Sequence, residues 1–471
     1  MGSTEEAGAE PSRTAMARAL IVLSGPLALA NAAMIFAGLF DVYVAGRVGV
    51  DAQAAVGLGA MLSSLAVFFF AGVTNGIVPM VSQYAGAGQT RECGETLVQG
   101  VLIALASGAF LILVALAVPL ARPQLAGLAG PRVGALTASY ISIRLLSGPF
   151  FLLILCVNKF LTGIHDTRPN ILIGVGSSAV QCLLSYTLGL GAFGMPALGL
   201  KGIAWAYALA QVGGAAVALG ACLLGPSRRR YPVRFGRRPV RADLLRRLLA
   251  LGVPLGAAQV FNNGSYLILS VVAARLGPEA AAAHAVASQV LLLPQRGLEV
   301  LGSAGSSLVG KYVGAGSRAR ATRQHWVAMT VGCGLAGVIG IVLWAFRGGI
   351  SGLLSPDAGA AAVTAGVFVV IALSMVPRAV MTVAQASLSA VGDVRIPSLT
   401  IIVGRWALLV PMTLLLVFWL DGGVVGVWVA ETLSVVVLAA VLLVRLVRGR
   451  RLDRPPAPSA PERTEALSGT D

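Results

Sequence analysis

The chain has 471 residues, of which 57% are hydrophobic and 11% are charged, and its formal net charge is +16. A soluble domain carries about a quarter charged residues, so this composition excludes an ordinary water-soluble protein. The basic excess does not predict nucleic-acid binding, because the arginines gather in short clusters beside apolar segments and no folded basic domain presents them.

Apolar runs of about twenty residues recur along the chain, and each is long enough to cross a hydrocarbon core of about 30 Å. Their length excludes the alternating ten-residue strands of an outer-membrane barrel. We therefore predict an all-α integral membrane protein. The twelve predicted transmembrane helices are residues 17–42, 55–82, 95–119, 134–159, 170–192, 199–224, 245–275, 280–310, 325–346, 362–390, 396–420 and 423–447.

These helices divide into two halves joined by a basic segment. The predicted parts are an N-terminal tail (1–16), an N-lobe (17–224), a basic linker (225–243), a C-lobe (244–447) and a disordered C-terminal tail (448–471).

Basic residues are unevenly distributed among the predicted loops. Nine arginines lie between Arg228 and Arg247, and more follow the last span, whereas the loops on the other side hold about one basic residue each. The positive-inside rule then places the linker and both termini in the cytoplasm, in a multi-pass protein of the inner or plasma membrane. Because the N-terminus begins with acidic residues and no basic region, we expect no cleaved signal peptide.

The two halves resemble each other at an offset of 228 residues. The matched segments are Pro26-Leu27 with Pro254-Leu255, Arg47-Val48-Gly49 with Arg275-Leu276-Gly277, and Tyr84 to Gly88 with Tyr312 to Gly316. Each half has an even number of spans, so both enter the membrane in the same orientation. This predicts two parallel six-helix lobes, related by a pseudo-two-fold axis along the membrane normal, around a central cavity.

Several ordered motifs resemble those of the multidrug and toxic compound extrusion (MATE) family, in its bacterial, DinF-like branch, within the MOP flippase superfamily. They are Asp41 to Gly46 (DVYVAG), the two Gly-Ala-Gly turns, Gly163 to Pro169 with its partner at Asp393, and Gly423 to Trp428 (GVVGVW). The resemblance covers about residues 17 to 447. It implies a secondary antiporter that exports small amphipathic compounds in exchange for protons or sodium ions by rocker-switch alternating access.

Asp41 is the strongest candidate for cation coupling, because ionisable residues inside a membrane are costly and usually functional. Its position matches the family's N-lobe carboxylate, and removal from water favours the protonated form of a carboxyl group. The alternative is a helix-end Asp paired with Arg47. In the family, the fifth helix often carries an Asn and an Asp. Here Gln181 and Ser185 stand there, which favours protons over sodium ions, and Asn158 is a further polar candidate.

Candidates for the substrate cavity lie mostly in the second half. Arg296 and Glu299 are three residues apart and can pair on one helix face, whereas Arg378 requires a carboxylate that Glu431 could supply. Both a structural ion-pair network and a polar pocket for neutral or anionic substrates remain open for these residues. The remaining cavity candidates are Tyr43, Asn262 and Asn263.

Other functions are less well supported by the sequence. A lipid-linked oligosaccharide or polysaccharide flippase is the alternative within the superfamily, although fourteen spans are common there. We expect no enzyme, because no acid, base or metal cluster shares one membrane depth, and His165 and His284 are interpreted as structural. We expect no metal or cofactor beyond the coupling ion. The expected partners are small molecules and membrane lipids but not nucleic acid, and the protein is expected to be a monomer.

Overall fold

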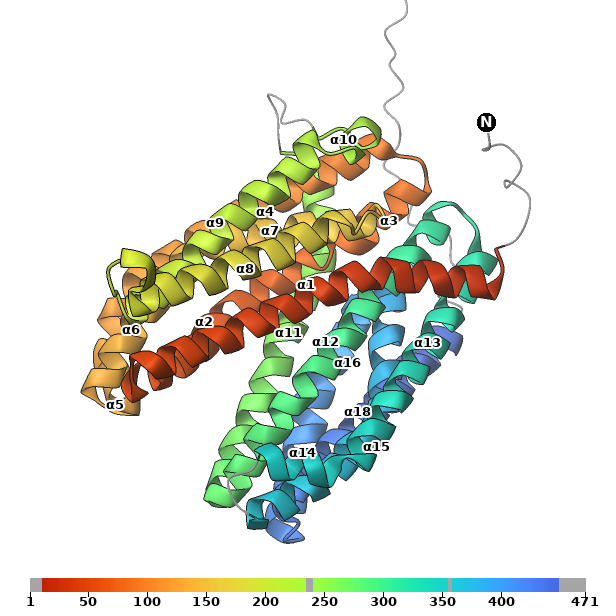
Figure 1. The fold of residues 1–471 in the computed structure, drawn as a ribbon. Coiled ribbons are helices and arrows are strands. Elements are labelled where there is room, and N and C mark those ends of the chain that lie inside the picture. Colours follow the sequence, from red (N-terminus) through yellow and green to blue (C-terminus); the bar gives the residue numbers. More distant parts are fainter. Residues whose placement is uncertain (1–10, 234–239, 355–357, 449–471) are drawn as a thin grey trace, which may run out of the picture.

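The structure, a computed structural model, describes residues 11–233, 240–354 and 358–448. In these ranges all regular elements are helices, arranged as two bundles (Figure 1). The N-lobe contains α1 (Arg13–Val48), α2 (Val50–Thr74), α3 (Ile77–Gly86), α4 (Thr90–Ala117), η1 (Val118–Ala121), α5 (Arg122–Ala129), α6 (Pro131–Leu146), α7 (Gly148–Gly163), α8 (Pro169–Leu190), η2 (Ala192–Gly194) and α9 (Leu200–Leu224).

The linker contains one short helix, α10 (Ser227–Arg230), and the C-lobe follows it. The C-lobe contains α11 (Ala242–Arg275), α12 (Pro278–Gly314), α13 (Arg318–Ala345), α14 (Arg347–Leu354), α15 (Ala358–Ala390), α16 (Arg395–Val403), η3 (Gly404–Leu409), α17 (Val410–Leu414), η4 (Leu415–Trp419) and α18 (Gly423–Arg448). We call the end of the molecule that carries α10 the linker end, and the opposite end the far end.

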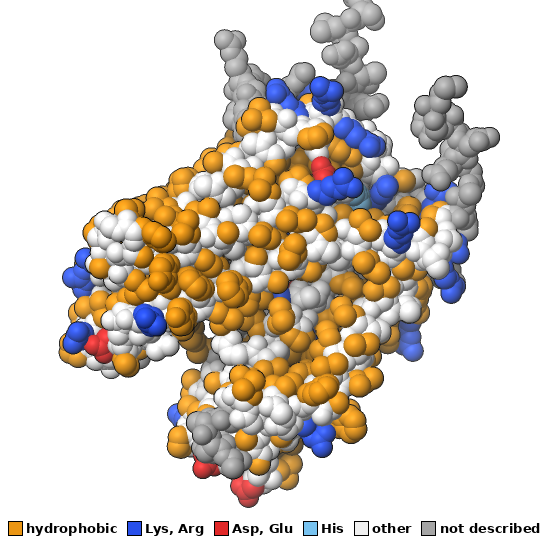
Figure 2. Space-filling model, viewed as in Figure 1, with side chains coloured by type: hydrophobic (Ala, Val, Ile, Leu, Met, Phe, Trp, Pro, Cys, Tyr) orange, Lys and Arg blue, Asp and Glu red, His pale blue; other side chains and the backbone are white. Residues whose placement is uncertain are grey.

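The predicted all-α membrane fold is confirmed. Among the described residues, ten helices or helix pairs are long and apolar enough to cross a membrane, and the bent pair α6–α7 makes eleven. The helix α12 has 37 residues but is not among them, since it carries charges such as Arg296 and Glu299 along its length. With α12, the architecture agrees with the twelve helices expected. Hydrophobic side chains cover the flanks of both bundles (Figure 2).

One predicted boundary differs from the structure. The tail predicted for residues 1–16 ends earlier, because α1 begins at Arg13 and the hydroxyl of Ser12 caps it by accepting a hydrogen bond from the amide of Ala15 at 3.1 Å. The disordered tail predicted after residue 448 lies outside the described residues.

Several predicted spans are not single α-helices, and the one predicted at 55–82 is divided into α2 and α3. The span predicted at 134–159 is bent by 47° between α6 and α7, where Ser147, Gly148 and Pro149 interrupt the ladder of hydrogen bonds. The span predicted at 396–420 contains two π-helical segments, η3 and η4. Because π-helical turns widen a helix locally and often mark functional positions, η3 is relevant to the site below.

The sequence repeat has a direct structural counterpart in the turns. Gly88 and Gly316, the last residues of the two Gly-Ala-Gly motifs, have φ of +76° and +72°. Only glycine adopts this left-handed region without strain, so the same residue is required in both lobes.

The lobes meet at the linker end through a pair of equivalent contacts. A Cβ atom at Gly86 would collide with the carbonyl of Lys311, and one at Gly314 would collide with the carbonyl of Gln83. Gln83 and Lys311 are separated by 228 residues, as are Gly86 and Gly314. The contact is therefore pseudo-symmetric, with backbone packed against backbone.

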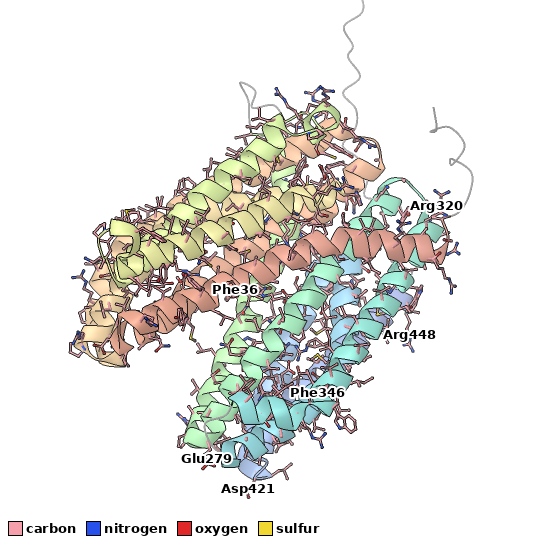
Figure 3. The ribbon with its side chains drawn as sticks, in the orientation of Figure 1. Phe36, Glu279, Arg320, Phe346, Asp421 and Arg448 are labelled. Atoms are coloured by element: carbon pink, nitrogen blue, oxygen red, sulfur yellow. The ribbon has the colours of Figure 1, made fainter. Side chains whose placement is uncertain are left out.

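Away from this contact the lobes diverge toward the far end (Figure 1). The space-filling view shows the molecule hollowed between the two lobes on that side (Figure 2). The side chains of Glu279 and Asp421 lie at the far end of the C-lobe, whereas Arg320 lies near the linker end (Figure 3). The structure is thus closed at the linker end and open at the far end.

Substitution of Gly314 by Val should open the linker end. The added side chain collides with the backbone of Gln83, and overpacking of this kind costs about 1–3 kcal/mol, enough to change the ratio of closed to open molecules by about tenfold. Pulsed electron resonance between spin labels at positions 91 and 318, in a variant lacking the five native cysteines, should show a longer distance.

The matched control is Gly334→Val in α13, where a Cβ atom meets nothing within 4 Å. This control should keep the short distance. A Gly314→Val variant with an unchanged distance distribution would show that the glycine contact does not determine closure.

Candidate functional site

Asp41 lies inside the N-lobe, on α1, with 2% of its surface exposed. Gln181 donates a hydrogen bond from Nε2 to Oδ2 of Asp41 at 2.7 Å, and the hydroxyl of Ser185 donates to Oδ1 at 2.5 Å. These two donors are four residues apart and so lie on the same face of α8. Gln181, a predicted cation-coupling candidate, thus contacts Asp41, whereas Arg47 is exposed on the surface.

A positive charge that the sequence analysis missed lies next to this carboxylate. Arg144 on α6 interacts electrostatically with Asp41 and lies over the ring of Tyr207, 4.0 Å from its centroid. Its Nη1 also donates a hydrogen bond to the hydroxyl of Tyr140 at 2.8 Å. A lone arginine within a predicted span was the signal that could have identified it.

A cavity of about 430 Å³ lies beside these residues, lined mostly by the N-lobe and partly by α11 and α12. Arg144, Gln181 and Asn158 line it, so Gln181 connects the carboxylate of Asp41 to the cavity wall. The Oδ1 atom of Asn158 is buried and has no hydrogen-bond partner among the described residues, so it can accept a hydrogen bond from a ligand. Its role in coupling stays a prediction.

Tyr43 does not belong to this site. Its side chain is 55% exposed and lines neither of the two cavities described here. Tyr43 directly precedes the buried Val44, so the turn of α1 directs its side chain outward, where the ring lies 6.0 Å from that of Phe40.

The C-lobe contains a buried cluster in which two arginines share one carboxylate. Arg378 of α15 donates to Glu431 of α18 at 2.7 Å, and Arg405 of η3 donates to the same carboxylate at 3.2 Å. The hydroxyl of Tyr266 donates to Oε1 of Glu431 at 3.0 Å. All three charged side chains are at most 2% exposed. The expected pairing of Arg378 with Glu431 is present, but the carboxylate is shared.

Arg405 is the second residue that the sequence analysis missed. It lies in the π-helical segment η3, and its guanidinium is 5.3 Å from the centroid of the Tyr266 ring. The Nε atoms of Arg405 and Arg378 are buried and without a partner in the described part of the chain. The cluster therefore retains both an excess positive charge and unused donors.

A second cavity, of about 230 Å³, adjoins this cluster. Arg378, Arg405 and Asn262 line it, whereas Asn263 lines neither cavity and donates to the carbonyl of Gln259 at 2.7 Å. Of the two neighbouring asparagines, only Asn262 is thus available to a ligand in this cavity.

The predicted pair of Arg296 and Glu299 is confirmed, with 2.9 Å between Nη1 and Oε2. Both side chains are about one-third exposed and face the cavities: Glu299 lines both, and Arg296 lines the larger. Lys159 of α7, a third residue missed from the sequence, also lines both cavities. The two cavities therefore adjoin at a cluster of charges that comes from both lobes.

The two histidines noted above occupy structural positions. His284 lies 5.4 Å from the ring of Trp428 and within hydrogen-bond distance of Ser270. His165 lies in the loop between α7 and α8, and its Nε2 is 3.2 Å from the carbonyl of Ser307 on α12. His165 thus bridges the two lobes near the linker end.

Across residues 11–233, 240–354 and 358–448, no three His, Cys, Asp or Glu side chains are grouped so that they could hold a metal ion.

A family model described as MatE matches the chain twice, at residues 26–187 and 254–415. The chain is 28% identical to "Probable multidrug resistance protein NorM" of Xanthomonas campestris pv. campestris, over 96% of this chain and 98% of that protein. It is 30% identical to the protein of the same name from Aromatoleum aromaticum, over 87% and 89% of the two chains.

Solved structures share the fold. "Outward-facing conformation of a multidrug resistance MATE family transporter of the MOP superfamily" gives a TM-score of 0.84 at 18% identity, over 93% of this chain and 96% of that chain. "Crystal structure of eukaryotic MATE transporter AtDTX14" gives 0.82 at 17% identity, over 94% and 99%.

Removal of the shared carboxylate should destabilise the C-lobe more than removal of one of its arginines. Glu431→Gln leaves two buried arginines without a carboxylate, and such a loss costs about 3–5 kcal/mol. Arg405→Met leaves one arginine paired with one carboxylate, so its melting temperature in detergent should fall less. Glu279→Gln, at the exposed far end, is the control, and equal shifts for all three variants would contradict the interpretation.

Acidification should weaken the contact that His165 makes between the lobes. Burial, aided by the positive charge of Lys311, lowers the pKa of His165 to about 4. In an opened molecule the exposed imidazole would titrate near 6.5. Between these values only the opened form binds the proton, so closure is complete above about pH 6.5 and weakens as the pH falls toward 4.

The distance between spin labels at positions 91 and 318 should therefore lengthen from pH 7 to pH 5. His165→Gln should remove this part of the dependence while keeping a hydrogen-bond donor. An identical pH profile in the variant and the parent would assign the dependence to another group.

Proposed function

The chain belongs to the MatE family, whose members are transporters rather than enzymes, and from this membership we propose that it exports small amphipathic molecules in exchange for ions. The multidrug resistance names of the relatives support efflux. The assignment to the DinF-like branch stays a prediction, because the relatives named above are NorM proteins.

The observation that carries the coupling mechanism is the buried Asp41 and its two donors on α8. A protonated carboxyl group donates from one oxygen, so proton binding would require Ser185 or Gln181 to change its hydrogen bond. The contact between α1 and α8 therefore differs between the two protonation states. A proton can bias the lobes only through such a difference in affinity between conformations.

Protons are the coupling ion that this site favours over sodium ions. The side chains that hydrogen-bond Asp41 are an amide and a hydroxyl, each of which uses a donor hydrogen toward the carboxylate. A sodium ion would need several oxygen lone pairs directed at one point. A proton needs only the carboxylate itself.

We propose that the linker end faces the cytoplasm. Arg228, Arg229 and Arg230 lie in α10, and Lys and Arg side chains gather at this end (Figure 2). By the positive-inside rule the open far end then faces the outside of the cell membrane. Export proceeds when the lobes rock so that closure alternates between the two ends. Since both cavities lie within one chain, a monomer suffices.

A flippase for lipid-linked saccharides is the second candidate. The positive charges at Arg378, Arg405 and Lys159 favour it, because such lipids carry anionic phosphates. The twelve helices favour the exporter, since fourteen are common among the flippases.

Asp41→Asn should abolish gradient-driven export while preserving the fold, because Asn has the same shape but cannot bind a proton. In proteoliposomes with a panel of dyes, imposed proton and sodium gradients should be tested separately. Transport by the parent should require the proton gradient, and transport by the variant should fall to that of empty vesicles.

Asp51→Asn is the matched control, since Asp51 forms a partly exposed ion pair with Arg132 at 3.0 Å. This variant should transport as the parent does. Undiminished proton-driven export by Asp41→Asn would refute the proposed coupling residue.

A further inference from the structure

Lys159 carries a charge that nothing in the described structure neutralises by contact. It lies on α7, in the interior of the N-lobe, and lines both cavities. No ion pair or hydrogen bond of its side chain is found among the described residues, although Glu299 and Arg296 act on it electrostatically. A lysine at membrane depth without a partner is costly, and such residues usually belong to a substrate or ion pathway.

The carboxylates around Lys159 are already engaged. Glu299 forms its ion pair with Arg296 at 2.9 Å. Glu431 is fully buried and accepts hydrogen bonds from Arg378 and from Arg405. Lys159 and the three arginines supply four positive charges, whereas the two glutamates supply two negative ones. The smaller cavity and its junction with the larger one therefore have an excess of positive charge.

The larger cavity has a different character. Its wall includes the apolar side chains of Val67, Phe68, Phe151 and Leu155, and Lys159 lies where it adjoins the smaller cavity. Ligand pockets of this kind hold an apolar body on hydrophobic side chains and fix its orientation with a few polar groups. A molecule that spans both cavities would place its apolar body in the N-lobe and its polar group at Lys159.

We propose that the junction of the two cavities binds the anionic group of the substrate, and that Lys159 is its principal ligand. The substrate class is amphipathic organic anions, with a carboxylate or sulfonate attached to an aromatic or aliphatic body. This inference rests on the proposed export function and names its substrate. An anion at Lys159 would also approach Arg296 of α12, so it would contact both lobes at once.

Binding to purified protein in a non-ionic detergent tests this assignment directly. Three probes with the same ring are compared: a naphthalene sulfonate, the corresponding sulfonamide, and a naphthyl trimethylammonium. Calorimetry should show the sulfonate bound most tightly. Lys159→Gln should weaken the sulfonate about tenfold, the value of one hydrogen bond to a charged group, and leave the sulfonamide within about twofold.

Lys159→Arg should restore most of the sulfonate affinity, which a merely structural role would not require. Lys201→Gln is the matched control, since Lys201 is exposed at the start of α9 and lines neither cavity. Preference for the ammonium probe, or a sulfonate affinity unchanged in Lys159→Gln, would overturn the proposal. Displacement of the sulfonate by an equal concentration of phosphatidylglycerol would overturn it in favour of a lipid headgroup.

Transport separates this proposal from the one on which it rests. If proteoliposomes export the ammonium probe along a proton gradient but not the sulfonate, the anion site is refuted and the exporter stands. If they move none of the three probes under any gradient, the proposed export function fails, whereas the binding result still decides the anion site.

Discussion

A charged side chain inside a membrane needs an opposite charge or a hydrogen-bonding group beside it. The interior of this protein offers few such groups, and their positions distinguish its charged residues. Asp41 is held by an amide and a hydroxyl, and Glu431 is shared by two arginines. Lys159 is without a contact of this kind among the described residues. The proposed proton site in the N-lobe and the proposed anion site at the junction of the lobes both lie where a charge is costly.

The internal repeat gives the two lobes equivalent backbone features, but their buried charged residues are not equivalent. The two lobes keep equivalent turns, such as Gly88 and Gly316, and equivalent contacts at the linker end. Their interiors have diverged in charge, from Asp41 in one to the cluster around Glu431 in the other. Equivalent backbone contacts in the two lobes thus coexist with interiors of different charge.

The sequence predicted the helical architecture and the repeat, because apolar run length and helical spacing are local properties. The pair of Arg296 and Glu299 was equally accessible, since three residues fix a common helix face. Arg405 was missed although a lone arginine in an apolar span is visible in the sequence. Its partner, Glu431, lies in another helix, and a π-helical turn rotates the side chain by an amount that regular periodicity does not anticipate.

At the linker end, Gly86 and Gly314 pack against backbone carbonyls of the opposite lobe. Dispersion between closely packed backbones is scarcely affected by dissolved salt, unlike attraction between exposed ions. The ionic strength of the surrounding solution should therefore have little influence on this closed contact at the linker end.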